Sequence, residues 1–382
     1  MGVAMNLTAL GSKLSRYRKQ LAMSEEEVCA VTHIPLERLQ SVEAGSQAPT
    51  GDEVLILADL YHCNFKFFIS NEPLAPFEQT EILYRRHGAE FIKEDRRAVQ
   101  EFLYLCETED FLMSELKAMK LEFPLPQASG NFKNDGIRAA EAFRLFNQHP
   151  TNAVPRDVYQ EIRQTGVHVF RRKLGNSNIS GLFLAHPTAG KCILVNYSED
   201  VYRQRFSAAH EFAHALFDAQ GGPSITYSRT TKADLVEVRA NTFASRYLMP
   251  SEILRQLPNP EQWTQENTQY WAHELRVSCV ALGIGLKSEG LISEQAFQRI
   301  KSYRVPRELK IDPELPAQLT TQQRERKAKL LEKGLSDSYV ALCLDAQSRG
   351  IITQGRLAEA LLSDLGGLQE LLSLYGRSRN GH

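Results

Sequence analysis

The chain has 382 residues, a length that exceeds one ordinary hydrophobic core and predicts two or three domains. Its 45 lysine and arginine residues nearly balance its 46 aspartate and glutamate residues, which argues against a polybasic nucleic-acid coat and against an acidic tail. No stretch approaches the ~20 apolar residues of a membrane span, the first residues lack a signal-peptide pattern, and the scattered cysteines form no CxxC pair. We therefore expect a cytoplasmic protein with reduced thiols and no membrane partner.

Residues 6 to about 70 carry apolar side chains at helical spacing, which predicts four or five short helices. Turn signals divide these helices. Residues 32–35 separate the second helix from the third, and residues 44–46, followed by Pro49, end the third. We expect an all-α domain over residues 1–70.

Residues 71–151 show longer and more charged helical patterns, of which residues 93–120 are the clearest example. Pro124 and Pro126, together with the polar stretch 130–134, close these patterns. This part of the chain is expected to be a helical connecting region.

Period-two patterns typical of strands appear next in three segments, residues 167–170, 179–185 and 192–196. The turn residues 187–190 predict that the last two strands form a hairpin. Helical patterns follow at residues 200–218, 233–248 and 267–288. Together these elements predict an α+β domain over residues 152–304.

Residues 306–316 are typical of a linker. They stand at the start of a helical C-terminal extension over residues 305–382, whose clearest helical patterns are at residues 339–349 and 354–365. We expect this tail to be an autoinhibitory or dimerising cap, so a homodimer is among the expected assemblies.

The segment 210–214 reads HEFAH and lies within the predicted helix 200–218. Residues four apart lie on one face of a helix, so His210 and His214 can direct two imidazoles at one ion while Glu211 points beside it. This HExxH pattern is the strongest chemical signal in the chain and indicates a metal site.

A catalytic zinc needs a third protein ligand and an open position for water. Asp218 lies about 12 Å along the helix from His210 at 1.5 Å per residue, which is too far for both to reach one ion. The next predicted helix offers Asp234 and Glu237. These two acids are three apart and share similar faces, so spacing alone does not choose between them.

Three motifs carry a resemblance to a known family. RFSAAHEFAHAL (205–216), EVRANTFA (237–244) and LMP (248–250) resemble the ImmA/IrrE family of metallo-endopeptidases, over about residues 155–300. The resemblance implies a zincin-like fold in which Glu237 is the third ligand. Asp234 then has a supporting or helix-start role, and Arg239 stands where many members carry a second acid.

The same resemblance implies the chemistry. The bound cation polarises the scissile carbonyl and lowers the pKa of its water, and Glu211 takes the water's proton and delivers it to the leaving amine. Two histidines and one carboxylate suit Zn²⁺ best, and Mn²⁺ or Fe²⁺ are also compatible. The sequence does not show which group stabilises the oxyanion. Tyr227 and His273 could reach the site, and a packing or surface role is the alternative for both. No organic cofactor is expected.

LAMSEEEV (21–28) and HIPLERLQSVEAG (33–45) resemble the XRE, or lambda-repressor-like, helix-turn-helix domain over about residues 7–69. The resemblance implies that Ser24 caps the second helix and that residues 35–43 form the recognition helix. Arg38, Gln40 and Ser41 are then the candidate contacts to double-stranded DNA.

Charge argues for an alternative role of this domain. Residues 1–70 hold six basic and eight acidic residues, a net charge of minus two, and Glu25, Glu26 and Glu27 follow the capping serine. A helix-turn-helix with this charge can serve as a protein-docking or dimerising module, and it can mimic or pair with a substrate of the same fold.

We therefore expect a mainly α, multidomain protein: a helix-turn-helix domain, a helical connection, an α+β metallopeptidase domain and a helical tail. The expected function is a regulatory metallo-endopeptidase that cleaves a protein, with a helix-turn-helix repressor as the first substrate to test. The alternatives are an XRE-type regulator whose metal domain senses a ligand or metal without proteolysis, and an interaction module such as an antitoxin-like repressor.

Overall fold

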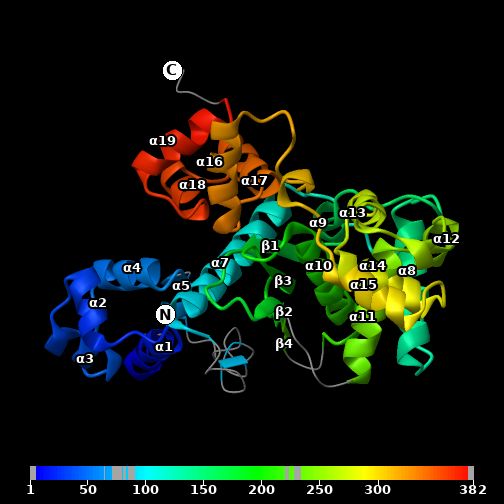
Figure 1. Ribbon diagram of the computed structural model, residues 1–382. Coiled ribbons are helices and arrows are strands. Elements are labelled where there is room, and N and C mark those ends of the chain that lie inside the picture. The colour runs from blue at the N-terminus through cyan, green and yellow to red at the C-terminus, as the bar shows by residue number, and fades with distance from the viewer. Residues whose placement is uncertain are drawn as a thin grey trace.

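A computed structural model describes residues 6–63, 65–70, 80, 83–84, 91–219, 223–227 and 234–376. Helices dominate these residues, and one four-stranded sheet lies among them (Figure 1). The expected mainly α architecture with a small α+β unit is therefore confirmed. Across the described ranges, no helix combines the length and apolar character that crossing a bilayer requires.

Five short helices form the N-terminal part of the chain: α1 (Leu7–Gln20), α2 (Glu25–Thr32), α3 (Leu36–Glu43), α4 (Gly51–Leu60) and α5 (Phe65–Ile69). Ser24 caps α2 as the sequence predicts, and the side chain of Glu27 bonds back to complete a capping box. His33 ends the helix in the left-handed conformation, at φ 58°. These helices enclose their own core, which includes Leu14, Leu39 and Tyr61.

The connecting region contains two helices, α7 (Lys93–Glu115) and α8 (Phe132–Phe146). The predicted helix 93–120 extends beyond the observed C-terminal end of α7. Lys117 takes a positive φ of 51°, which an α-helix does not accommodate. The polar stretch 130–134 begins a helix rather than closing one, since Asn131 caps α8. α8 packs on α11 and shares the core of the α+β unit.

The sheet contains β1 (His168–Arg172), β2 (Ile179–His186), β3 (Gly190–Asn196) and β4 (Ser224–Tyr227), in the order β1-β3-β2-β4. β1 runs parallel to β3, whereas β2 runs antiparallel to both β3 and β4. The predicted hairpin between the second and third strands is confirmed. β4 has no counterpart among the predicted strands, because four residues are too few to show a period-two pattern.

Helical layers cover both faces of the sheet, so alternate strand residues enter two different cores. Val169, Phe183 and Ile193 face the core that contains α10 (Val201–Phe217) and α11 (Leu235–Leu248). Phe170, Leu182 and Leu194 face the core formed by α7 and the C-terminal helices.

Five further helices surround the first of these cores: α9 (Val158–Arg163), α12 (Ser251–Gln256), α13 (Gln265–Glu274), α14 (Cys279–Ser288) and α15 (Glu294–Ser302), with the 3₁₀ turn η1 (Pro260–Gln262). The single helix predicted over residues 267–288 is wrong. Arg276 takes a positive φ of 52°, and Ser278 caps a new helix, so the chain forms α13 and α14 instead.

The tail contains η2 (Arg307–Leu309), α16 (Thr321–Glu332), α17 (Asp337–Ser348), α18 (Gln354–Ala360) and α19 (Leu365–Leu374). The helix predicted over residues 354–365 ends early, because Leu362 takes a φ of 47° and Asp364 caps α19. The tail helices pack beside α7 on the outer face of the sheet (Figure 1).

Candidate metal centre

α10 carries the HExxH segment and is fixed by its cap and by its apolar side. The carboxylate of Asp200 accepts a hydrogen bond from the backbone N–H of Tyr202, 3.0 Å away, and begins the helix. Ala209, Phe212 and Ala213 are buried against the core that α8 and α11 share. This packing sets the rotation of α10 and thereby directs its histidines toward α11.

The structure brings the three predicted ligands together. His210 and His214 on α10 and Glu237 on α11 offer one ligand atom each, all within 4.8 Å of one another. The Nε2 atoms of the two histidines lie 3.1 Å apart, and each lies 3.3 Å from an oxygen of Glu237. Both histidines are 1% exposed, so the cluster is closed to bulk water on most sides.

The outward nitrogens of both imidazoles are already engaged. Nδ1 of His210 donates to the amide oxygen of Asn241 at 3.1 Å, and Nδ1 of His214 donates to the carboxylate of Asp218 at 3.0 Å. With Nδ1 protonated, a neutral imidazole presents its lone pair at Nε2. With both rings in this form, two lone pairs and a carboxylate lie close together, and this donor set fits a divalent metal ion between them.

The pKa shifts of the ligand side chains also indicate that the cluster favours a positive charge. Burial lowers the pKa of His214, but its hydrogen bonds with Asp218 and Glu237 outweigh burial and raise that pKa to about 10. Burial alone would raise the pKa of Glu237, but its bonds to His210 and His214 hold it well below its ordinary value. The site thus favours a positive charge at its centre.

Asp218 is not brought into the ligand cluster, in agreement with the distance argument from the sequence. Its second oxygen forms an ion pair with Arg239, whose guanidinium lies 4.4 Å from the ring centre of Phe217. Sequence reasoning missed the orienting roles of Asp218 and Asn241. Asp218 follows His214 by four residues, and that spacing was an available signal. Asn241 bonds His210 from another helix, so spacing gave no signal for it.

Glu211 lies beside the ligands and is fully buried. Gly181 of β2 makes room for it, since a Cβ at that position would lie 3.1 Å from the carboxylate oxygen of Glu211. Burial raises the pKa of Glu211, although His214 and His210 oppose this shift. Its Oε1 has no hydrogen-bond partner within the described part of the chain, as expected of a group that awaits a water or substrate proton.

The other sequence candidates lie elsewhere. Asp234 caps α11 by accepting from the backbone N–H of Val236 at 3.0 Å. Tyr227 ends β4, and its side chain falls outside the described residues. His273 of α13 bonds the hydroxyl of Tyr202 at 2.9 Å, which is two turns and about 12 Å along α10 from the metal ligands, so it does not reach the site.

Two histidines oriented by an amide and a carboxylate, a glutamate from the next helix and a buried acid beside them make up the geometry of a metallohydrolase site. Residues 162–287 match the family model of the IrrE N-terminal-like domain. The model bears a peptidase-family label, Peptidase_M78, and supports a metallopeptidase role for this part of the chain. The match covers all the candidate metal-centre residues but only about a third of the chain. A search of curated proteins finds no match.

The three candidate DNA contacts lie on α3, outside the matched segment. Arg38 forms an ion pair with Glu53 at 2.8 Å. Gln40 donates to a carboxylate oxygen of Glu25 at 2.7 Å, and the hydroxyl of Ser41 donates to the carbonyl of Glu37 at 2.7 Å. Each candidate contact thus has a partner within the N-terminal helices.

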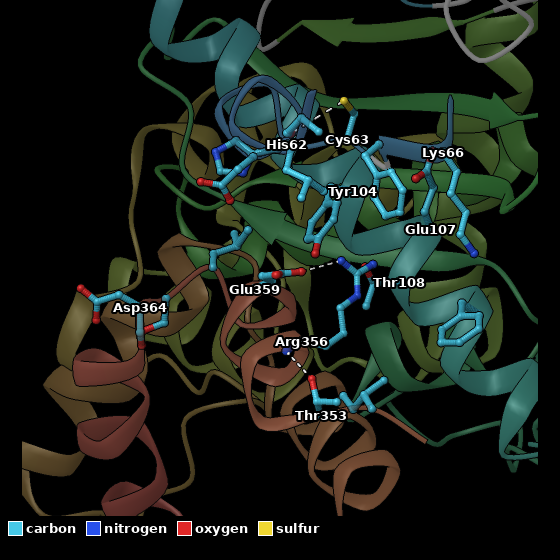
Figure 2. Close-up of a pocket in the computed structure, with 18 of the residues that line it drawn as sticks. His62, Cys63, Lys66, Tyr104, Glu107, Thr108, Thr353, Arg356, Glu359 and Asp364 are labelled. Atoms are coloured by element: carbon cyan, nitrogen blue, oxygen red, sulfur yellow. Dashed lines mark hydrogen bonds and ion pairs between the residues drawn. The ribbon is translucent and has the colours of Figure 1, made fainter. Parts of the chain in front are cut away.

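Another cavity lies away from the metal centre. It has a volume of about 940 Å³ and is lined by residues of α4, α5 and α7 and of the segment 351–364 (Figure 2). Figure 2 shows Tyr104 of α7 between His62 and Arg356, whose guanidinium lies 5.6 Å from the tyrosine ring and bonds Glu359 at 2.7 Å. No predicted metal ligand lines this cavity.

Proposed function

We propose that this chain is a metal-dependent endopeptidase in which His210, His214 and Glu237 hold a zinc ion. The observation that carries the proposal is the convergence of three ligand atoms within 4.8 Å, beside a buried glutamate. Mn²⁺ or Fe²⁺ would also accept this donor set.

Glu211 is the acid–base group in the proposed reaction. When bound, the metal supplies a polarised carbonyl and a water of lowered pKa. The carboxylate of Glu211 takes the proton of that water and passes it to the amine of the departing peptide. Its burial, which raises its pKa, makes the protonated form accessible and so suits the second step. Asn241 and Asp218 hold the two imidazoles in the tautomer that a metal requires.

β4 is the proposed binding edge for the substrate backbone. Among the described residues β4 pairs only with β2, and its Ser224 hydroxyl lies 3.5 Å from the carboxylate of Glu211. An extended peptide can add to such an edge through its own N–H and C=O groups, which would draw its backbone past the catalytic carboxylate.

A helix-turn-helix repressor is the proposed substrate, in the cytoplasm. The ImmA/IrrE resemblance supports this substrate, as does the N-terminal set of five helices, which resembles such a repressor. In this proposal the N-terminal helices locate the substrate or its DNA. The ion pair of Arg38 with Glu53 and the net negative charge of residues 1–70 favour a protein partner over DNA.

The test replaces Glu211 with glutamine, which keeps the shape of the side chain but removes its basicity. We expect metal content, measured by elemental analysis, to stay unchanged while cleavage of a co-expressed repressor falls by about 10²–10⁴-fold. Glu266→Gln, an exposed change on α13, is the matched control and should cleave normally. If Glu211→Gln leaves both the cleavage rate and the regulated transcription unchanged, a metal-sensing regulator that does not hydrolyse protein replaces the present proposal.

A further inference from the structure

A second cavity, of about 690 Å³, lies one helical turn from the metal ligands. Phe206, four residues before His210 on α10, forms one wall, and Asn241, four residues after Glu237 on α11, forms another. Both wall residues also contact His210: the Phe206 ring lies 6.4 Å from its ring centre, and Asn241 accepts its Nδ1–H. The cavity therefore adjoins the proposed catalytic site.

The cavity combines apolar walls with an excess of positive charge. Phe206, Val280, Ile284 and Val305 supply apolar surface. Arg203, Arg304 and Lys310 also line the cavity, against a single acid, Asp200. The first turn of α14, capped by Ser278, completes the wall, and its backbone N–H groups add to the positive potential.

Arg304 differs from the other two cations in its bonding. Arg203 pairs with Glu199 at 2.9 Å, and Lys310 pairs with Asp200. Arg304 is exposed and donates to two backbone carbonyls, those of Lys301 and Tyr303, each at 2.8 Å. No ion pair joins Arg304 to a carboxylate within the described residues. Arg304 can therefore bind the carboxylate of a ligand without breaking an existing ion pair.

We propose that this cavity binds an acidic side chain of the substrate, next to the cleaved bond, and that Arg304 sets this preference. The inference rests on the proposed peptidase function and deepens it by naming a substrate class. One turn of helix is about 5.4 Å, and one extended residue advances about 3.3 Å. A side chain one or two residues from the bond at the metal therefore reaches the cavity, with its methylenes on the apolar walls and its carboxylate at Arg304.

The experiment uses the full-length, zinc-loaded protein and a mixture of synthetic random-sequence decapeptides. Mass spectrometry reads the residues that flank each cut. The wild type should prefer glutamate or aspartate over glutamine at one flanking position by about tenfold. This ratio corresponds to the free energy of one charge-assisted hydrogen bond. Arg304→Glu should lose this preference and favour lysine or arginine. Arg307→Glu makes the same charge change three residues away, outside the cavity, and should behave as the wild type.

A binding measurement separates this inference from the proposed function. Immobilised Glu211→Gln protein should retain acidic peptides from the same mixture, and the added Arg304→Glu change should abolish that retention. Acidic retention with neither the peptides nor the co-expressed repressor cut by the wild type would support the cavity and refute the peptidase. Cleavage without an acidic preference, or an acidic preference that survives Arg304→Glu, would refute the cavity alone. If peptides are neither cut nor retained and the repressor stays intact, both proposals fail.

Discussion

At the scale of single residues, the groups behind the metal ligands decide whether the ligands are ready to bind. Asn241 and Asp218 accept from the outward nitrogens of the two histidines and so hold each ring in one tautomer and one orientation. Without such partners an imidazole can rotate or present the wrong nitrogen to the ion. The affinity for metal therefore depends on residues that do not touch it.

Asn241→Ala tests this dependence. We expect the affinity for zinc to fall by about 10–100-fold, measured by competition with a chelating dye, because His210 loses its acceptor. Asn134→Ala, at an exposed asparagine on α8, is the matched control and should bind zinc as the wild type does. Unchanged affinity in Asn241→Ala would show that the tautomer of His210 is fixed by something else.

Gly181→Ala tests the space around the catalytic carboxylate. The added Cβ would lie 3.0 Å from the carbonyl oxygen of Leu194 and 3.1 Å from Glu211, so either the strand or the carboxylate must move. We expect cleavage to fall by about 10–100-fold while zinc content stays the same. Gly355→Ala, whose nearest neighbour would be 3.9 Å away, should leave the rate unaltered. A wild-type rate in Gly181→Ala would mean that Glu211 tolerates displacement.

The sequence predicted the candidate ligands but not the residues that support them. The spacing of His210 and His214 on one helix is a local property, so a pattern reveals it. Asn241 and Gly181 act across the gap between elements, and their roles depend on how α11 and β2 pack on α10. Only the assembled fold shows those contacts.

At the scale of elements, the segment predicted as a linker is a structural part of the α+β unit. Glu314 accepts from Arg163 and Arg171 at 2.7 Å each, and Asp312 pairs with Arg171 at 2.8 Å. The Arg171 side chain is fully buried, and its guanidinium lies 4.7 Å from the ring centre of Tyr159. The proline and charge pattern of residues 306–316 suggested a linker because a buried ion pair leaves no local signature in sequence.

Glu314→Gln should therefore destabilise the fold. Removing one partner leaves buried charge uncompensated, which costs about 3–5 kcal/mol, measured by urea unfolding at pH 7. Burial alone would raise the pKa of Glu314, but Arg163 and Arg171 hold it below its ordinary value. A lowered folded-state pKa stabilises the protein above the unfolded value of about 4.3, and this stabilisation is lost as the pH falls further.

The difference between wild type and Glu314→Gln should accordingly be largest at neutral pH and shrink below about pH 4.3. Glu308→Gln, at an exposed site in the same segment, provides the matched control and should unfold as the wild type does at both pH values. An equal deficit at neutral and acid pH would indicate that packing, rather than charge, holds residues 306–316.

Element boundaries were the less predictable part of the fold. The first three strands and the HExxH helix follow from hydrophobic periodicity, which is set by which side chains face a core. The division of residues 267–288 into two helices depends instead on Arg276 in a left-handed conformation, which its side chain does not favour. Tertiary packing on either side of that turn determines it.

At the scale of the whole molecule, the sheet belongs to two cores at once. Its outer face packs with α7 and α17, and the buried residues there include Phe170, Leu194 and Tyr339. The C-terminal helices therefore complete the fold of the unit that carries the metal centre. This packing indicates a structural role for the tail, as an alternative to the expected role of an autoinhibitory or dimerising cap.

Truncation before Pro306 distinguishes these roles. Removal of the tail would uncover the apolar side chains of α7 and the sheet that pack against it, and would leave Arg171 without its acidic partners. We expect the shortened protein to be insoluble or to bind a hydrophobic dye, as measured by size-exclusion chromatography and fluorescence. A soluble fragment that is more active than the full chain would favour the inhibitory cap. A soluble fragment that is a monomer where the full chain is a dimer would favour the dimerising cap.

The helix α7 also spaces the N-terminal helices from the sheet. Its 23 residues contain neither glycine nor proline, so it is a continuous rod of about 35 Å. Arg96 and Gln100 bond to backbone carbonyls of the N-terminal helices, while Glu107 and Glu109 bond to histidines of the sheet. These contacts at both ends of α7 hold the N-terminal helices at a set separation from the sheet that carries the metal centre. Under the proposed function, a partner held by those helices is cut at a fixed distance from its point of attachment. The distance between the attachment point and the bond, as well as the sequence around the bond, therefore selects where the partner is cut.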